Sequence, residues 1–144
     1  MKVAKIAQMP PPTVQADSVV KDAIPLMSSS CGCGVAVLDG ERFVGTLSRD
    51  DVLLRVATDG MDVGTTTVRS VMHPPVETVT GDMDAKEALR KMHAQGRCYL
   101  GVVDNAGALK GWLAICDLFK EREEDLSHQM DAIVSYLAAD NPGG

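Results

Sequence analysis

The stretch Gly45-Thr46-Leu47-Ser48-Arg49-Asp50-Asp51 decides the fold, because Gly111-Trp112-Leu113-Ala114-Ile115-Cys116-Asp117 repeats its pattern later in the chain. An earlier pair agrees, since Thr13-Val14-Gln15-Ala16-Asp17 falls on Thr78-Val79-Thr80-Gly81-Asp82 after a shift of 65 positions. A fixed internal period indicates two copies of one supersecondary unit. Each copy has only about 50 to 60 residues, a size at which a lone core is marginal. We therefore expect the copies to bury apolar faces against each other and to form ligand clefts between them.

The spacing of apolar residues predicts the same elements in both copies. A short strand leads into a helix, and two further strands lead into a second helix. In the first copy we expect these elements at Thr13-Val14, from Ser18 to Met27, at 34–38, at 43–47 and from Ser48 to Gly60. In the second copy we expect them at 77–80, 84–93, 98–104, 109–114 and from Asp117 onward. The order β-α-β-β-α, found twice, predicts an α+β fold with two repeats related by pseudo-twofold symmetry.

The remaining segments are predicted from their composition. Residues 3–6 are expected to form a short strand or turn, and residues 59–67 a polar linker that contains glycine. The last helix is predicted to continue toward Ala138, with apolar residues at Phe119, Leu126, Met130, Ile133, Val134 and Leu137. The chain thus divides into a first repeat (1–60), a second repeat (61–120) and a C-terminal helical extension (121–144).

The overall composition limits the class of partner. The 144 residues carry a net charge of -6, which is the wrong sign for a protein that binds the phosphate backbone of nucleic acids. The N-terminus lacks the apolar segment of a signal peptide, and no apolar run is long enough to cross a membrane. We expect a soluble, cytoplasmic protein without a nucleic-acid or membrane partner.

The order of elements resembles the CBS domain, named after cystathionine β-synthase, and two copies in tandem resemble a Bateman module. The residues that carry the resemblance are the proline-marked lead-in strands, the first helix of each copy and the Gly-x-x-Ser/Thr-x-x-Asp segments. They lie at 9–14, 23–27 and 45–51 in the first copy and at 71–75, 87–92 and 111–117 in the second. No single motif is specific, but their repeated order is, and it covers residues 1 to 120.

The resemblance implies that adenosine-type ligands (AMP, ADP, ATP or S-adenosylmethionine) bind in clefts between the repeats, with no obligatory cofactor. In the first copy, Ser48 matches the phosphate position and Asp51 the ribose position. Gly34 and Val35 match the strand beside the base, and Pro12 and Thr13 match the lead-in strand. Such a segment opens a helix whose free N–H groups favour phosphate, and the aspartate accepts hydrogen bonds from ribose hydroxyls.

The second copy departs from this pattern. Asp117 matches the ribose position, Tyr99 and Leu100 the strand, and Pro75 and Val76 the lead-in strand. Ala114 stands at the phosphate position, where a methyl group contacts no phosphate and caps no helix. Since Tyr99 is also expected to crowd the base, the first site is expected to be the more readily occupied.

A simpler interpretation exists for the same carboxylates. The pattern Ser48-x-x-Asp51 is also typical of a helix capping box, which requires no ligand. Asp117 is not expected to form such a box, since Ala114 has no hydroxyl; its alternative is an acidic residue stabilised by the helix dipole. His73 is interpreted as a surface or cleft-rim residue.

Four cysteines (Cys31, Cys33, Cys98 and Cys116) are too few for a disulfide scaffold, and we expect them to be reduced, with packing roles. The alternative is a thiol or zinc sensor that uses Cys31, Cys33 and Cys98, although paired Cys-x2-4-Cys spacing is absent. No nucleophile-base arrangement or catalytic carboxylate pair is visible, so no enzyme is predicted.

The leading hypothesis is a regulatory module that binds an adenosine-type nucleotide and signals to an unidentified regulated protein. The alternative is a ligand-free interaction or dimerisation module that assembles through its C-terminal helix. Tandem CBS modules resemble disc-shaped dimers, so we also expect a homodimer in which that helix contributes packing.

Overall fold

The computed structural model describes residues 1–27, 34–74 and 78–140, and within α5 it does not place the side chains of 120–125 and 139–140. Its elements follow the repeated order expected from the sequence. The first repeat contains β1 (Thr13–Gln15), α1 (Val20–Met27), β2 (Gly34–Asp39), β3 (Arg42–Ser48), α2 (Arg49–Asp51) and the π-helical η2 (Val52–Ala57). The second contains β4 (Thr78–Thr80), α4 (Ala85–Gln95), β5 (Tyr99–Val103), β6 (Leu109–Ala114) and α5 (Ile115–Asp140). Two short helical segments, η1 (Val3–Lys5) and α3 (Val68–Val71), precede the repeats.

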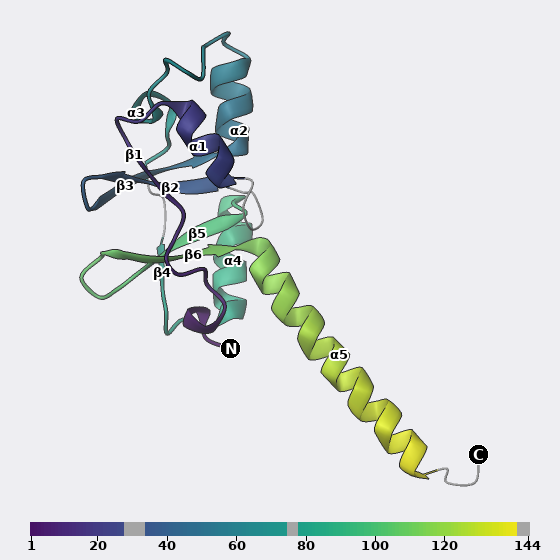
Figure 1. Cartoon of the computed structure of the whole chain (residues 1–144). Helices are drawn as coiled ribbons and strands as arrows, with labels where there is room; N and C mark the ends of the chain where they lie inside the picture. The colour runs from purple at the N-terminus through teal and green to yellow at the C-terminus, as the bar shows by residue number, and fades with distance from the viewer. Residues whose placement is uncertain (28–33, 75–77, 141–144) are drawn as a thin grey trace.

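Each repeat is built on one three-stranded sheet, in the order β1-β2-β3 or β4-β5-β6. The first strand of each sheet runs parallel to the second, which pairs antiparallel with the third. Figure 1 shows the two sheets facing each other in the middle of the molecule, with the helices on their outer sides. The α+β fold with two repeats and a C-terminal helix is therefore confirmed.

The segment before each repeat packs on the other repeat. Val3 of η1 is fully buried in the core of the second repeat, and Gln8 pairs with Trp112 of β6. In the same way, Val68 of α3 is fully buried in the core of the first repeat, and His73 pairs with Thr46 of β3. After each of these segments the chain crosses to the other repeat. The core of each repeat therefore includes a short segment that precedes the other repeat in the sequence.

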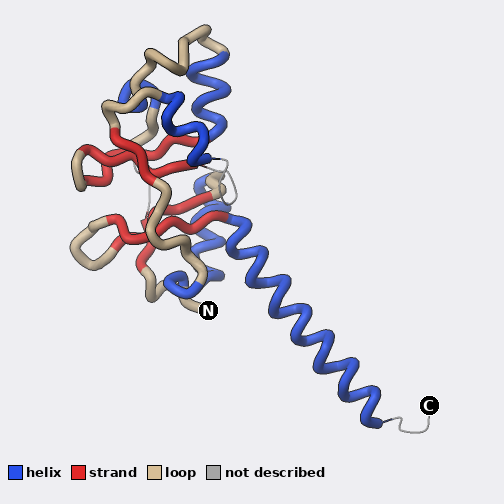
Figure 2. Tube along the Cα trace, viewed as in Figure 1, coloured by secondary structure: helices blue, strands red, loops and turns tan. Residues whose placement is uncertain are grey.

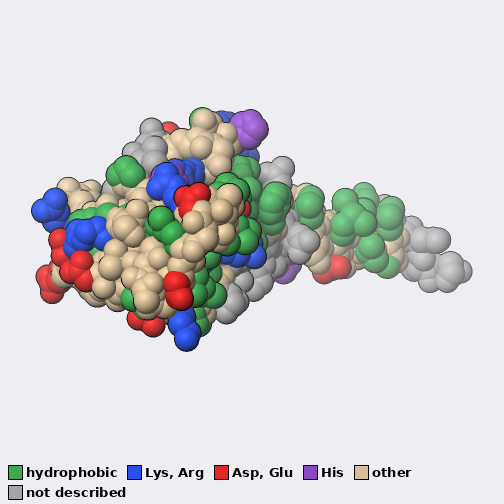
Figure 3. Space-filling view, turned by 90° about the horizontal axis from the view of Figure 1, so that it is seen from above, with side chains coloured by type: hydrophobic (Ala, Val, Ile, Leu, Met, Phe, Trp, Pro, Cys, Tyr) green, Lys and Arg blue, Asp and Glu red, His purple; other side chains and the backbone are tan. Residues whose placement is uncertain are grey.

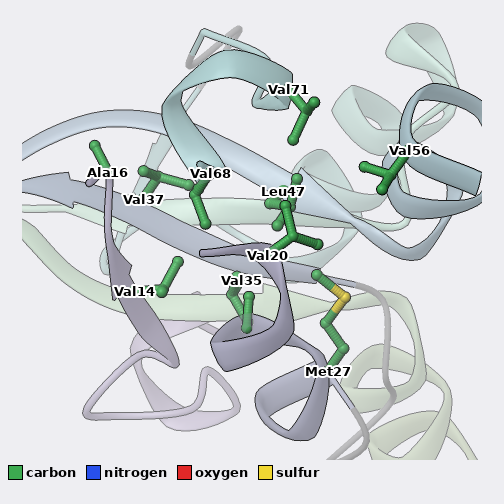
Figure 4. Close-up of a cluster of buried hydrophobic side chains, with 11 residues drawn as sticks. Val14, Ala16, Val20, Met27, Val35, Val37, Leu47, Val56, Val68 and Val71 are labelled. Carbon is green, nitrogen blue, oxygen red and sulfur yellow. The ribbon is translucent and has the colours of Figure 1, made fainter. Parts of the chain in front are cut away.

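Aliphatic side chains fill both cores, because aromatic residues make up only 3% of the chain. Figure 4 shows the first core, where Leu47 and Val35 from the sheet meet Val20 and Met27 of α1 and Val68 of α3. The second core has the same plan, with Leu113 and Leu100 against Met92 of α4. On each strand alternate residues face the core, so the residues between them face the other repeat.

Those intervening residues form a third cluster between the repeats. It consists of Ala36, Tyr99 and Trp112, with Phe43 and Leu109 packed around them. The rings of Tyr99 and Trp112 stack with centroids 4.8 Å apart and planes inclined by 17°. The expected burial of one copy against the other thus occurs between the sheets.

Two short helical segments precede the repeats. Residues 3–5, expected to form a short strand or turn, form a single 3-10 turn, η1, and the linker after η2 leads into a helix, α3, that the sequence did not predict. Both segments are too short for a helical period to show in the sequence, and burial of Val3 and Val68 stabilises them. Pro25 lies inside α1, and the helix continues to Met27.

The packing of η1 on the second repeat yields a testable prediction. Val3→Ala should lower the free energy of unfolding by about 1 to 3 kcal/mol, because it removes buried methyl groups and leaves a cavity. Lys5→Ala, on the exposed side of the same turn, should change it little. Urea unfolding followed by the fluorescence of Trp112, the single tryptophan, measures both. Equal effects of the two substitutions would contradict the packing of this segment.

Candidate functional site

The first polar cluster lies where β3 ends and α2 begins. The Ser48 hydroxyl accepts a hydrogen bond from the Asp51 backbone N–H at 3.1 Å, and the Asp51 carboxylate accepts the Ser48 backbone N–H at 2.8 Å. The Ser48 hydroxyl also lies 3.0 Å from the same carboxylate oxygen. This is the capping box that the spacing allowed. The cap holds the Asp51 carboxylate in place although that side chain is only 5% exposed.

His73 brings a second group to this carboxylate from the segment after α3. Its backbone N–H and C=O both pair with Thr46 of β3, at 2.9 and 2.8 Å. Its Nε2 lies 2.7 Å from Oδ1 of Asp51, the oxygen that Ser48 does not use. A buried carboxylate is stable only with such partners, so Asp51 depends on both Ser48 and His73.

Arg55 orients the imidazole of His73. One guanidinium nitrogen lies 3.4 Å from His73 Nδ1, and the other donates to the Val71 carbonyl at 3.3 Å. Because a guanidinium only donates, Nδ1 must accept, and the proton of a neutral imidazole lies on Nε2, facing Asp51. Arg55 therefore donates to His73, and His73 in turn donates to Asp51.

Tyr99 enters the same region from the second repeat. Its hydroxyl donates to Thr46 Oγ1 at 3.3 Å and accepts from Arg97 at 3.3 Å. Burial raises the pKa of Tyr99 above the usual value of tyrosine, and the nearby charge of Asp51 acts in the same direction. The phenol therefore stays neutral and remains a hydrogen-bond donor near the carboxylate.

A hollow of about 180 Å³ opens between the two repeats at this point. Ser48, Arg49 and Asp50 line one side, and Gly96, Arg97, Cys98 and Tyr99 line the other. The left-handed conformation of Gly96 ends α4 and directs the chain into this lining. With two guanidinium groups and one carboxylate, the lining suits an anionic ligand.

The equivalent position in the second repeat is different. The Asp117 carboxylate accepts the backbone N–H of Ala114 at 3.0 Å, so it forms half of a capping box, contrary to our expectation. This half of the box is a bond from the backbone N–H of residue 114 to the carboxylate of Asp117. It does not require the hydroxyl that Ala114 lacks. Gln8 stands where His73 stands in the first repeat, so no imidazole is available there.

The other residues matched from the sequence occupy several environments. Pro12 and Thr13 lie at the start of β1, on the side of β2 away from β3. The Pro12 carbonyl accepts the Ala36 N–H, and Thr13 pairs with Ala36. Gly34 is the neighbour of Ser48 in the sheet. Val35 and Leu100 are buried in the two cores, and neither lines the hollow between Ser48 and Tyr99. Pro75 and Val76 lie outside the described residues.

The structure thus groups residues from both repeats, whereas the sequence grouped them by copy. The contact of His73 with Asp51 was not predicted, and Arg49, Arg55 and Arg97 were not predicted as site residues. The distance in sequence between His73 and Asp51 leaves no local pattern, because their contact depends on the pairing of His73 with Thr46. Only the sheet topology reveals it.

The cysteines also differ from expectation. Cys98 is free and exposed rather than packed, since it follows Arg97 at the mouth of the hollow. Cys116 is disulfide-bonded, whereas we expected reduced thiols; Cys31 and Cys33 lie outside the described residues. Within the described ranges, no three histidine, cysteine or acidic side chains lie close enough to hold a metal ion.

A second hollow, of about 520 Å³, lies between α4 and α5. Leu89, Met92 and Ile115 line it together with Arg90, His93 and Arg97. Among the described residues that line it, none supplies a carboxylate that would accept ribose hydroxyls. None of the helices in the described part of the chain is long and apolar enough to cross a membrane.

Comparison with known proteins adds a family and a fold. The model of the CBS domain family matches residues 3–58 and again residues 68–124. An uncharacterized protein of Methanopyrus kandleri is 27% identical over 104 residues, which cover 72% of this chain and 53% of that protein. The chain spans about half the length, or less, of the curated relatives it matches.

Two solved structures illustrate the likeness. A putative signal-transduction protein with CBS domains from Burkholderia ambifaria has a TM-score of 0.79 and 27% identity, over 87% of this chain and 96% of that one. The CBS domain pair of protein MJ0100, in complex with 5'-methylthioadenosine and S-adenosyl-L-methionine, has a TM-score of 0.75. At 17% identity, over 87% of this chain and 98% of that one, the second likeness concerns the fold alone.

The contact of His73 with Asp51 predicts a cost when the imidazole is removed. His73→Ala should lower the free energy of unfolding by about 1 to 3 kcal/mol, because it leaves a buried carboxylate oxygen without its partner. His73→Gln, whose amide can donate to Asp51, should recover part of the loss. Chemical unfolding measures these effects, with His128→Ala on the exposed part of α5 as the control. No loss relative to that control would show that Asp51 does not need His73.

The raised pKa of Tyr99 predicts a dependence of stability on alkaline pH. Because folding favours the neutral phenol, this contribution is fully present below the usual pKa of tyrosine, about 10, and is lost as pH rises through the higher folded value. Unfolding free energies measured from neutral pH to about pH 11 should fall more steeply for the wild type than for Tyr99→Phe. Parallel curves would contradict the burial of this hydroxyl.

Proposed function

Because the chain belongs to the CBS domain family, as its repeats predicted, we propose that it is a regulatory module that binds an adenosine-type ligand between its two repeats. CBS pairs are generally regulatory rather than catalytic, which fits the expectation that this chain is not an enzyme. The observation that carries the proposal is the buried carboxylate of Asp51, which bonds to Ser48 in the lining of a hollow between the two repeats.

The side chains in and next to the hollow support a position for each part of the ligand. Asp51 is the acceptor for the ribose hydroxyls, since a carboxylate has about four lone-pair sites and keeps its bonds to Ser48 through one oxygen. Arg49 and Arg97 are the proposed partners of a phosphate group, and Ser48, which lines the same hollow, is a further phosphate contact. The bound structure of MJ0100 supports an adenosine-type ligand for a pair of this fold.

The size of the hollow implies that the repeats move on binding. Its volume of about 180 Å³ is below the range of about 300 to 1,000 Å³ typical of ligand pockets. His73 also occupies the Asp51 oxygen that the ribose requires. We infer that the ligand displaces His73 and favours a more open arrangement of the repeats. A regulated protein then recognises this arrangement, which is a shift between two populations.

The second cleft is proposed to bind more weakly or not at all. Asp117 keeps a carboxylate there, but Ala114 offers no hydroxyl and Gln8 no imidazole. The residues Pro12, Thr13, Gly34, Val35, Tyr99 and Leu100 contribute backbone or packing contacts around the two clefts. Pro75 and Val76 are assigned to them from the family resemblance.

A second candidate function is assembly without a small ligand. It is favoured by α5, whose distal apolar side chains are exposed. We propose that the module is a homodimer in either case, and that the nucleotide, if bound, acts on that dimer.

A thermal-shift panel tests the binding proposal. It contains AMP, ADP, ATP, S-adenosylmethionine and zinc. A ligand at 100 times its dissociation constant adds about 2.7 kcal/mol, which raises the melting temperature by a few degrees at this chain length. We expect at least one adenosine compound to produce this shift. A shift with zinc alone would favour the sensor alternative, and no shift at all would leave assembly as the function.

The asymmetry between the clefts predicts the effects of two matched substitutions. Asp51→Asn should weaken binding of the active nucleotide by about tenfold to a hundredfold, because it removes a charged acceptor worth about 1.5 to 3 kcal/mol. Asp117→Asn should have a smaller effect. Titration calorimetry on folded protein measures both, with Ser48→Ala as the control for the cap, expected to cost about 1 kcal/mol of stability.

The opposite ranking would assign the ligand to the second cleft. Equal affinities for the wild type and both variants would contradict the role of either carboxylate in binding.

A further inference from the structure

The distal part of α5 stands away from the rest of the protein. Its first turns pack against α4 and β6, and residues 126–138 are all exposed. Figure 1 shows the helix extending from the second repeat as a single rod, and Figure 2 shows the same course along the backbone. An exposed helix of this kind is stable in water only when its apolar face is covered.

The apolar residues of this segment follow a heptad pattern. Leu126, Met130, Ile133 and Leu137 are separated by four, three and four residues, and Phe119 lies seven residues before Leu126. These are the spacings of the a and d positions of a coiled coil. All five side chains are more than half exposed. Figure 3 shows hydrophobic side chains gathered along the projecting helix. We call these five residues the α5 seam.

The rest of the chain does not cover the α5 seam in this structure. From Ile115 to Asp140 the helix contains no glycine or proline, so nothing in its sequence favours a bend back toward the repeats. The charges point to a copy of itself as the partner. Residues 126–138 contain no lysine, arginine or glutamate; their one aspartate, Asp131, and one histidine, His128, occupy positions away from the seam.

The flanks of the seam support the same partner. Between Leu126 and Leu137 the e and g positions hold Ser127, Gln129, Val134 and Tyr136, where charged residues would select a different chain. Two identical helices therefore meet over this part of the seam without like-charge repulsion, and Val134 and Tyr136 widen the apolar contact. The turn between Phe119 and Leu126 is charged, with Lys120 and Arg122 at e and g and Glu123 at a, so the pairing centres on residues 126–137.

We propose that the α5 seam pairs with the α5 seam of a second copy of this chain, forming a two-helix contact that holds the dimer together. This inference rests on the homodimer of the proposed function and names its interface. It places the contact on α5, away from the Ser48–Tyr99 hollow, so pairing and nucleotide binding are separable.

Sedimentation equilibrium of the full chain at micromolar concentration tests the interface. The wild type should have the mass of two chains, and Ile133→Asp should weaken the dimer at least about tenfold, because it puts a charge at the centre of the seam. Ser135→Asp, which adds the same charge on the outward face, should remain a dimer. Unchanged Trp112 fluorescence in Ile133→Asp shows that its repeats stay folded.

Three results would overturn the interface: a wild type with the mass of one chain, an Ile133→Asp variant that stays dimeric, or dissociation of Ser135→Asp as well. A nucleotide titration of Ile133→Asp separates this inference from the binding proposal. We expect its affinity to equal that of the wild type, whatever its mass. An affinity that fell together with the mass would contradict the independence of the two sites.

Discussion

The contact between Tyr99 and Gly34 is the constraint on which the arrangement of the repeats depends. A Cβ atom at position 34 would lie 3.2 Å from the Tyr99 ring and 2.8 Å from the Leu47 carbonyl oxygen, so a side chain does not fit there. The phenol ring occupies the space that this glycine leaves and stacks on Trp112. It therefore sets the distance between the sheets and places its hydroxyl at Thr46.

The same contact makes the two clefts unequal. Gly34 and Tyr99 occupy equivalent positions of the two repeats. The first repeat therefore has no side chain at this position, and the second has a phenol. Asp51 bonds to Ser48 and His73, and the Tyr99 hydroxyl bonds to the neighbouring Thr46, whereas Asp117 accepts one backbone N–H from Ala114. The two repeats thus have similar sites, but the site at Asp51 has more polar side chains than the site at Asp117.

The sequence predicted most of the fold because the signals that specify it are local or repeated. The period, the strand spacing and the Ser48 cap each lie within a short window, and all three agree with the structure. The pairing of His73 with Thr46 and the burial of Val3 in the second core depend on contacts between distant segments. Such contacts leave no local pattern, which is why the sequence predicted neither the contact of His73 with Asp51 nor the burial of Val3.

We propose that a ligand binds between the repeats by replacing His73 on Asp51. A crystal structure of the protein soaked with the nucleotide that gives the largest thermal shift is the most direct test. We expect the ribose hydroxyls on Asp51, the phosphate near Arg49 and Arg97, and His73 turned away. A nucleotide bound at Asp117, with the contact between His73 and Asp51 intact, would contradict it.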